Sequence, residues 1–366
     1  MNTSGIIHAM SRRNVLARVF RRIRSSLFAT FSDTIVTITL AVGLGWVCWK
    51  LSHWAFLDAV NFTGSAAECR TVSGACWAAV GNNLHLFLFG TYPSRDRWRP
   101  AAALILIVAC FCLLFIRPIR RWDIVLPLYG FSLGLVLLLL LGDDRLGIPK
   151  IDADTIGGLI LTFFISWMAL PVALPIALVL ALARQSNLPA IRVLAVSYIE
   201  LVRGLPLIVV LFMAAVLFPL FTEGGSSMPK SFRAMIGISL FAAAYLAEVI
   251  RGGLQAIPRE QLKAAEALGL RYWQIQFKIV LPQVFPIIVR PMAGMYISFF
   301  KNTSLISVIG LFELTGITTI VITKPEWAPF SEETYVIVGL VYIVCCWAIS
   351  RLASSIERQL SAFNER

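Results

Sequence analysis

The sequence predicts an all-α, polytopic integral membrane protein with about eight transmembrane helices. Of its 366 residues, 58% are hydrophobic and only 14% are charged, whereas about 25% of the residues of an average soluble domain are charged. Long uncharged runs recur along the chain, and a helix needs about 20 largely apolar residues to cross a bilayer core. These observations exclude a purely soluble protein.

Seven uncharged runs are the regular candidates for membrane spans. Each is long enough to cross the bilayer core when the polar side chains at its ends reach the headgroup region. In chain order, these runs cover residues 34–49, 101–116, 124–142, 155–183, 204–222, 234–247 and 334–350.

The eighth element, residues 282–323, is apolar but irregular. Prolines and charged residues interrupt it, among them Pro291, Lys301 and Glu313. At about 1.5 Å rise per residue it is too long for one straight crossing. We therefore expect one crossing followed by a broken or re-entrant piece, which is stable at membrane depth only where protein buries its backbone or water reaches it.

The N-terminal segment, residues 1–33, is predicted to be basic and cytoplasmic. Residues 1–30 contain six arginines and no acidic residue. Apolar residues such as Val15, Val19 and Ile23 recur at helical spacing, which favours an amphipathic helix on the membrane surface. A disordered arm is the alternative.

The distribution of basic residues predicts the orientation. With a cytoplasmic N-terminus and eight crossings, 20 Lys and Arg fall in cytoplasmic segments and 10 in outside segments, as the positive-inside rule requires. The net charge of +12 then reflects contact with the lipid membrane, and nucleic acid is not an expected partner. Arg95, Arg97 and Arg99 are the weak point of this topology, because it leaves them outside.

The composition divides the rest of the chain into two parts. Residues 34–154 hold three spans and a long polar loop over residues 51–100, and residues 155–360 hold the remaining five elements. Cys69 and Cys76 lie in the polar loop. A disulfide between them can persist in an oxidising compartment, although two cysteines on a loop do not establish one. No cysteine or histidine spacing typical of a metal site occurs.

The polar interval over residues 258–282 is predicted to hold two short helices joined by a corner. The first covers residues 259–268 and ends at Gly269, which can take the left-handed conformation that closes a helix. Pro258 suits its first turn, because the amide hydrogen that proline lacks would be unpaired there. The second helix covers residues 271–280.

Two interpretations of this interval compete. Gly252 and Gly253 are expected to end the preceding span, and the small side chains of Ala264 and Ala265 would let another protein surface approach closely. The interval would then be a docking element. The alternative is an amphipathic connection on the bilayer, anchored by Trp273 and its apolar neighbours.

The interval resembles the "EAA" loop of ABC-importer permease subunits. That pattern is Glu-Ala-Ala, three residues, Gly, nine residues, Ile, one residue and Leu-Pro, and Lys263 stands at the position of its glutamate. The matching residues are Ala264, Ala265, Gly269, Ile279, Leu281 and Pro282.

Other segments resemble the polar amino-acid branch of this family, the histidine/glutamine permease-like proteins. These segments are residues 198–206, 244–253 and 301–305, and the resemblance extends over residues 155–360. Residues 1–150 look like the longer permeases of general L-amino-acid uptake systems. The resemblance implies a type I ABC-importer permease core in a bacterial inner membrane.

The resemblance also implies a division of labour. Two permeases, this chain and a paralogue, would form the path for an L-amino acid, and a periplasmic binding protein would deliver it. A cytoplasmic ABC ATPase dimer would use the ATP and grip the loop. This chain has no G-x-x-x-x-G-K-[ST] motif, so it is expected to bind no cofactor and not to be an enzyme. The residues expected to couple it to the ATPase are Lys263, Ala264, Ala265, Glu266, Gly269, Ile279, Leu281 and Pro282.

Lys263 inverts one charge at the expected ATPase contact. Glu260 and Glu266 flank it at helical spacing, so either can replace the lost carboxylate or pair with the lysine. We expect that coupling survives in an altered form.

Glu248, Lys301 and Glu313 are the costly charges within or beside the spans. Glu248 is a candidate partner for the amino group of a zwitterionic substrate, and Lys301, with Thr303 and Ser304, for its carboxylate. Pairing among these charged groups that fixes helix packing, or a position of Glu248 and Lys301 at the membrane interface, explains the same residues equally well.

A proton-coupled secondary amino-acid transporter that acts without an ATPase is the alternative function. Glu248 and Glu313 would then relay protons. An intramembrane enzyme is a third class, but neither an H-E-x-x-H nor a G-x-S-x-G motif occurs. The spaced framework of residues 264–282 favours the permease.

Overall fold

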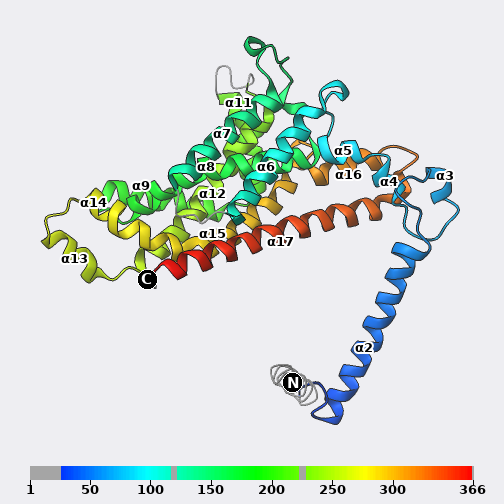
Figure 1. The fold of residues 1–366 in the computed structure, drawn as a ribbon, viewed down its shortest axis with the longest axis horizontal. Helices are drawn as coiled ribbons and strands as arrows, with labels where there is room; N and C mark the ends of the chain where they lie inside the picture. The colour runs from blue at the N-terminus through cyan, green and yellow to red at the C-terminus, as the bar shows by residue number, and fades with distance from the viewer. Residues whose placement is uncertain (1–25, 117–121, 222–227, 365–366) are drawn as a thin grey trace, which may run out of the picture. The chain divides into compact units, whose positions relative to one another are not determined.

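The structure is a computed structural model that describes residues 26–116, 122–221 and 228–364. Within these ranges the chain is helical, and strand-like pairing is limited to four isolated bridges. The chain divides into two compact units, Met1–Ala78 and Ala79–Arg366 (Figure 1). The predicted amphipathic N-terminal helix falls mostly outside the described residues.

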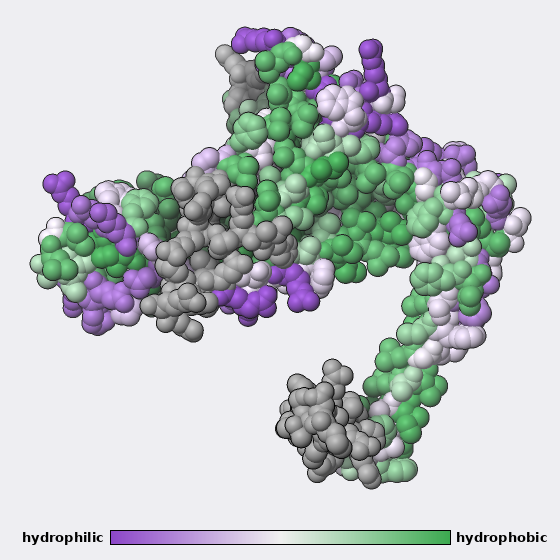
Figure 2. Space-filling view, viewed as in Figure 1, coloured by the Kyte–Doolittle hydropathy of each residue, from purple (hydrophilic) through white to green (hydrophobic). Residues whose placement is uncertain are grey.

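The first unit contains one candidate span, α2 (Phe31–Ser52), which continues through a π-helical turn to Leu57. A capping box starts it, because the Thr30 side chain accepts from the Asp33 amide and the Asp33 side chain accepts from the Thr30 amide, both at 3.2 Å. None of its side chains is buried, and Figure 2 shows hydrophobic side chains along its length. This helix contains the first predicted span.

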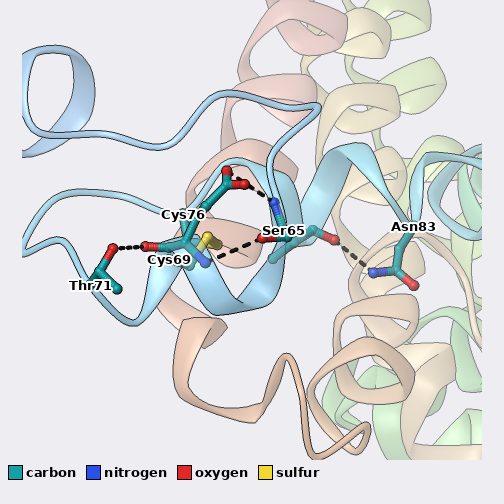
Figure 3. Close-up of a disulfide and its surroundings, with 7 residues drawn as sticks. Ser65, Cys69, Thr71, Cys76 and Asn83 are labelled. Atoms are coloured by element: carbon teal, nitrogen blue, oxygen red, sulfur yellow. Dashed lines mark hydrogen bonds between the residues drawn. A yellow bond between two sulfur atoms is a disulfide. The ribbon is translucent and has the colours of Figure 1, made fainter.

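A disulfide joins Cys69 and Cys76 (Figure 3), whose Cα atoms are 5.4 Å apart. Cys69 ends the short helix α3 (Ala66–Cys69), and the Ser65 side chain caps the start of that helix by accepting from the Glu68 amide. The bridge therefore fastens a small helix to the strand-like segment that follows it. The cysteine pairing that the sequence left open is present in the structure.

The second unit begins with short helices and a helical hairpin. Its elements before the bundle are α5 (Leu84–Phe89), α6 (Trp98–Ile116) and α7 (Trp122–Leu141), and α4 (Ala78–Gly81) spans the boundary between the units.

Arg99 fastens the hairpin of α6 and α7. Its side chain is 1% exposed and donates to the carbonyl oxygens of Leu139 at 2.7 Å and Pro149 at 3.0 Å. The Tyr92 hydroxyl donates to the Leu140 carbonyl at 2.9 Å. A cation is favoured there, because the C-terminal carbonyls of a helix carry a partial negative charge. Arg99 therefore has a structural reason to lie at this end of α7. Its position outside, which the positive-inside rule disfavours, is then weaker evidence against the predicted topology.

Four long helices form the bundle at the centre of the second unit. Buried alanines at four-residue spacing on α8, Ala169, Ala173, Ala177 and Ala181, face the hydrophobic core that α8 shares with α12. Small side chains let helix backbones approach closely in a membrane. The four helices are α8 (Gly158–Arg184), α12 (Lys230–Gln255), α15 (Leu281–Asn302) and α17 (Ser331–Asn364).

The predicted span over residues 204–222 is half of a bent pair. α9 (Pro189–Gly204) ends where a second helical stretch, Leu207–Phe221, begins, and the two are bent by 105°. The second stretch consists of α10 (Leu207–Phe212), a π-helical turn and α11 (Phe218–Phe221). Pro206 explains the break, because a proline disfavours helical backbone at the residue before it.

The expectation that Gly252 and Gly253 end their span is wrong, since α12 continues to Gln255. A Cβ atom added to Gly253 would lie 2.4 Å from the Ile288 side chain and 2.8 Å from that of Val284. The glycine therefore permits close packing of α12 against α15.

The second helix of the polar interval also differs from its prediction. α14 (Tyr272–Ile275) continues through the π-helical turn Gln276–Val280 into α15, so that Tyr272–Ile309 is one helical stretch. A π-turn shifts the backbone hydrogen bonds by one residue. Pro282 is tolerated there because it lies in the first turn of the α-helix that follows.

The irregular element breaks as predicted. The helical stretch ends at Ile309, Gly310 takes a left-handed conformation with φ of +79°, and α16 (Leu314–Ile322) follows. One crossing and a separate short helix result.

The described residues contain five stretches long and apolar enough to cross a membrane, and the bent pair is a sixth. The shorter apolar helices Trp98–Leu113 and Pro127–Leu141 lie where two further spans were predicted, so the predicted number of eight is approximate. The all-α polytopic fold is thus confirmed. The boundaries predicted at residues 33 and 154 stay a prediction.

The two ends of the second unit are distinct. α13 (Arg259–Ala267), α14 and the C-terminal part of α17 lie at one end, and α5 and α16 lie at the opposite end (Figure 1). Hydrophobic side chains cover much of the surface between them (Figure 2). We call the end that holds α13 and α14 the elbow end, after the corner predicted between the two short helices of residues 258–282.

Candidate functional site

The polar interval at the elbow end is a helical corner, which we call the elbow (residues 258–282). α13 starts after Pro258 and ends at Ala267, and Gly269, two residues later, has a φ of +76°. The Gly269 amide donates to the Glu266 carbonyl at 2.9 Å and the Leu270 amide to the Ala265 carbonyl at 3.2 Å. These bonds form a Schellman motif. The predicted glycine corner is confirmed.

The two faces of α13 differ. On one face, Ala265 is buried and Leu262 packs against the hydrophobic core, as does Leu270 just beyond the helix. The side chains of Lys263, Ala264 and Glu266 point outward and are exposed. The most prominent is Leu268, which is 81% exposed and was not singled out from the sequence. The sequence feature that could have identified Leu268 is its position directly before Gly269, the residue predicted at the corner.

The second arm of the elbow joins it to the bundle. Ile279 and Leu281 pack against the core, and the Gln283 side chain donates to that of Gln261 at 3.0 Å, linking the two arms. Among the residues matched to the family pattern, Ala264 and Gly269 are exposed, Ala265 is buried, and Ile279 and Leu281 pack against the core. A force applied to α13 would reach α15 through the corner at Gly269 and then through the helical stretch Tyr272–Ile309.

An ion-pair cluster lies beside the elbow, at the ends of α8, α9 and α12. Glu248 on α12 pairs with Arg184 of α8, with Arg251 at 2.9 Å and with Arg203 of α9 at 3.6 Å. Arg184 also pairs with Glu200 at 3.3 Å. The Glu248 side chain is 16% exposed. This arrangement favours a role for Glu248 in fixing three helices, but through arginines and not through the expected pairing with Lys301 or Glu313.

Glu313 lies in a second polar cluster. It is fully buried, and one carboxylate oxygen accepts from the amides of Thr315 at 2.8 Å and Gly316 at 2.9 Å, at the start of α16. The other accepts from the hydroxyls of Tyr342 on α17 at 2.8 Å and Thr162 on α8 at 3.3 Å. The N-terminus of α16 stabilises the carboxylate. Through these four hydrogen bonds, Glu313 joins α16 to α17 and α8.

Lys301, Thr303 and Ser304 lie at the end of α15. The Lys301 side chain is exposed, and within the described ranges no ion pair joins it to Glu248, whose partners are arginines. Thr303 is 1% exposed and lines a small cavity between α8, α12 and α15. The other polar residues of that cavity, Ser166 and Tyr296, had no motif to indicate them.

The comparisons with known proteins agree with this geometry. A family model described as "Binding-protein-dependent transport system inner membrane component" matches residues 173–362. The chain is 37% identical over 350 residues to the inner membrane amino-acid ABC transporter permease protein YhdY of Escherichia coli (strain K12), covering 93% of this chain and 92% of that protein.

Two further similarities extend this result. The chain is 33% identical over 404 residues to the glutamate/glutamine/aspartate/asparagine transport system permease protein BztC of Rhodobacter capsulatus, covering 92% of each chain. A crystal structure of an amino acid ABC transporter with histidines matches with a TM-score of 0.50 and 29% identity, covering 55% of this chain and 92% of the other.

Proposed function

The chain belongs to the family of binding-protein-dependent transport system inner membrane components, and we propose that it is the path-forming permease subunit of an ATP-driven importer of L-amino acids. YhdY and BztC are amino-acid transport permeases by name and align with over nine-tenths of the chain. The elbow is the observation that carries the proposal. No finding supports the proton-coupled alternative.

The proposed partners follow from the family. A cytoplasmic ATPase dimer binds and hydrolyses ATP and docks on the elbow, so this chain itself is no enzyme and binds no cofactor. A periplasmic binding protein supplies the amino acid, and a paralogous permease completes the path. Docking is supported by the exposed face of α13, because a helix that carries load needs both an accessible surface and fixed ends.

The proposed orientation places the N-terminus and the elbow in the cytoplasm of a bacterium whose inner membrane holds the chain. The disulfide between Cys69 and Cys76 supports it, because such bridges persist outside the cytoplasm. One candidate span, Phe31–Leu57, separates the described N-terminal residues from that loop.

The proposed substrate path runs along the exposed side of α15. Lys301 supports this location, because a charged side chain at membrane depth faces a water-filled cavity or a protein partner and Lys301 is exposed on the single chain. Thr303 and Ser304 contribute polar groups near it. Glu248 belongs to the proposed path only if it exchanges its arginine partners for substrate.

Leu268→Asp tests docking. A side chain that is 81% exposed contributes little to the permease fold, but a charge there would be buried in any contact with an ATPase. We expect the variant permease to keep its thermal stability, while ATP-dependent uptake of radiolabelled amino acid by proteoliposomes falls at least about tenfold.

Leu146→Asp is the matched control. Leu146 is 63% exposed but lies in the short helix Asp144–Leu146, away from the elbow. Normal uptake by this variant is expected. Uptake that persists without an ATPase under a proton gradient would contradict the proposed function, whereas normal ATP-driven uptake by Leu268→Asp would contradict docking at this tip alone.

Lys263→Glu tests the inverted charge. Lys263 is exposed, and among the salt bridges of the described residues none joins it to Glu260 or Glu266, so its ammonium group is available to a partner. We expect the variant to assemble with its ATPase and to change the number of amino acids transported per ATP hydrolysed. An unchanged ratio and unchanged assembly would remove any special role for this lysine.

A further inference from the structure

A groove at the elbow end lies outside the proposed docking tip and outside the substrate path. It has a volume of about 580 Å³ and lies between the end of α8, the turn that joins α8 to α9, and the start of α14. Its walls include Val179 and Leu182 of α8 and the aromatic residues Tyr272, Trp273 and Phe277.

The lining changes character along the groove. Aliphatic side chains of α8 form one part, and α8 is one of the candidate membrane spans. The turn contributes the polar residues Gln185, Ser186 and Asn187 at the end of that helix. A groove that is apolar along a membrane helix and polar where the helix ends matches the two parts of a lipid molecule.

The aromatic wall is unusually open. Tyr272 is 53% exposed, Trp273 is 59% exposed and Phe277 is 58% exposed, and Val179 opposite them is 65% exposed. Tryptophan and tyrosine are enriched where a membrane helix meets the headgroup region. This patch of exposed aromatic surface therefore needs a covering molecule, and the membrane interface supplies one.

The basic residues near the groove indicate the charge of the molecule that would fill it. Arg192 donates to the Ser186 carbonyl from two nitrogen atoms, at 2.9 and 2.6 Å, which holds its guanidinium against the polar turn. Arg271 directly precedes the aromatic wall and Lys278 directly follows it, and both are exposed. The described residues that line the groove carry no charge of either sign, and the charges that border it in the sequence, these three among them, are basic. An anion therefore suits the polar end.

We propose that this groove binds one anionic phospholipid. Its acyl chain lies against α8 and the ring of Trp273, and its phosphate lies among Arg192, Arg271 and Lys278. Because the lipid contacts both the turn after α8 and the base of the second elbow arm, it stabilises the position of that arm against the bundle.

Lipid retention by the complete transporter complex tests this proposal. The complex is reconstituted in nanodiscs of phosphatidylcholine alone or of an equimolar mixture with phosphatidylglycerol, and native mass spectrometry counts the lipids retained. We expect one phosphatidylglycerol to be retained in preference. The triple variant Arg192→Gln/Arg271→Gln/Lys278→Gln should bind it about a hundredfold more weakly, since each basic residue near an anionic surface contributes a factor of about five.

Two further variants make the result specific. Val179→Trp fills the apolar part of the groove and should also release the lipid, although it changes no charge. Arg145→Gln/Lys150→Gln removes two exposed charges from the segment between α7 and α8, outside the elbow, and should retain it. Retention by both groove variants, or equal retention of the two lipids by the unaltered complex, overturns the proposal. Loss of the ATPase with the lipid retained assigns the groove to a protein partner and also overturns it.

Discussion

Glu248→Gln is expected to lower the stability of the second unit by about 3 kcal/mol, because removing one member of a buried ion pair leaves its partners uncompensated. Three arginines share this carboxylate. Glutamine has nearly the same shape, so the change removes the charge with little loss of packing. The measurement is the midpoint of thermal unfolding of the purified permease, with ATP-driven uptake measured in parallel.

Burial explains why this ion-pair cluster should matter more than others on the chain. The side chains of Glu248, Arg184 and Arg251 are 16%, 23% and 29% exposed, so water screens them poorly. Glu200 is 57% exposed and pairs only at the margin of the cluster. In the Glu248→Gln variant, Glu200 is the only carboxylate left in the cluster. The net charge of the cluster then rises from +1 to +2, since its three arginines are unchanged.

Glu357→Gln is the matched control. Glu357 is 27% exposed and pairs with Arg290 at 2.7 Å, but the Arg290 side chain is 70% exposed, so water screens this partner and the pair is expected to contribute about 0–1 kcal/mol. Equal unfolding shifts for the two variants would contradict the role assigned to Glu248. A higher KM with unchanged unfolding would instead support contact between Glu248 and the amino group of the substrate.

The sequence predicts local structure at the elbow better than it predicts packing. Gly269 was expected at a helix end because its left-handed conformation follows from its lack of a side chain, and its φ of +76° agrees. Gly253 was expected to end a span by the same reasoning, but it allows contact with Ile288, which is distant in sequence. Composition does not distinguish these two uses of glycine.

The ion-pair cluster likewise contains one contact that the sequence allows and another that depends on how the helices pack. Arg251 lies three residues after Glu248, one helical turn away, so the sequence alone allowed that pair. Arg184 precedes Glu248 by 64 positions, and their contact depends on how α8 and α12 pack. Glu248 could therefore be identified as a costly charge, although its principal partner could not.

A glycine joint between α5, α8 and α16 has no equivalent among the sequence predictions. Gly158 has a φ of +66°, and its amide donates to the Phe312 carbonyl at 2.8 Å, just before α16. An added Cβ atom would lie 2.6 Å from the carbonyl oxygens of both Leu86 and Phe87. Three segments therefore meet through their backbones at this glycine.

Gly158→Ala is expected to prevent normal assembly of this joint. The left-handed conformation alone costs about 1–2 kcal/mol for a residue with a side chain. The two contacts of 2.6 Å involve backbone carbonyls of α5, which cannot move aside as a flexible side chain would. We expect a total loss of at least about 3 kcal/mol, visible as a low yield of monodisperse permease and a lowered unfolding midpoint.

Gly147→Ala separates the two contributions. Gly147 has a nearly identical φ of +70°, but nothing lies within 4 Å of an added Cβ atom, so this variant measures the conformational cost alone. The difference between the two unfolding midpoints then reports the clash with α5. Because that clash exists only while α5 is seated against α8, similar midpoints would mean that the N-terminal part of the second unit is not held to the bundle through this joint.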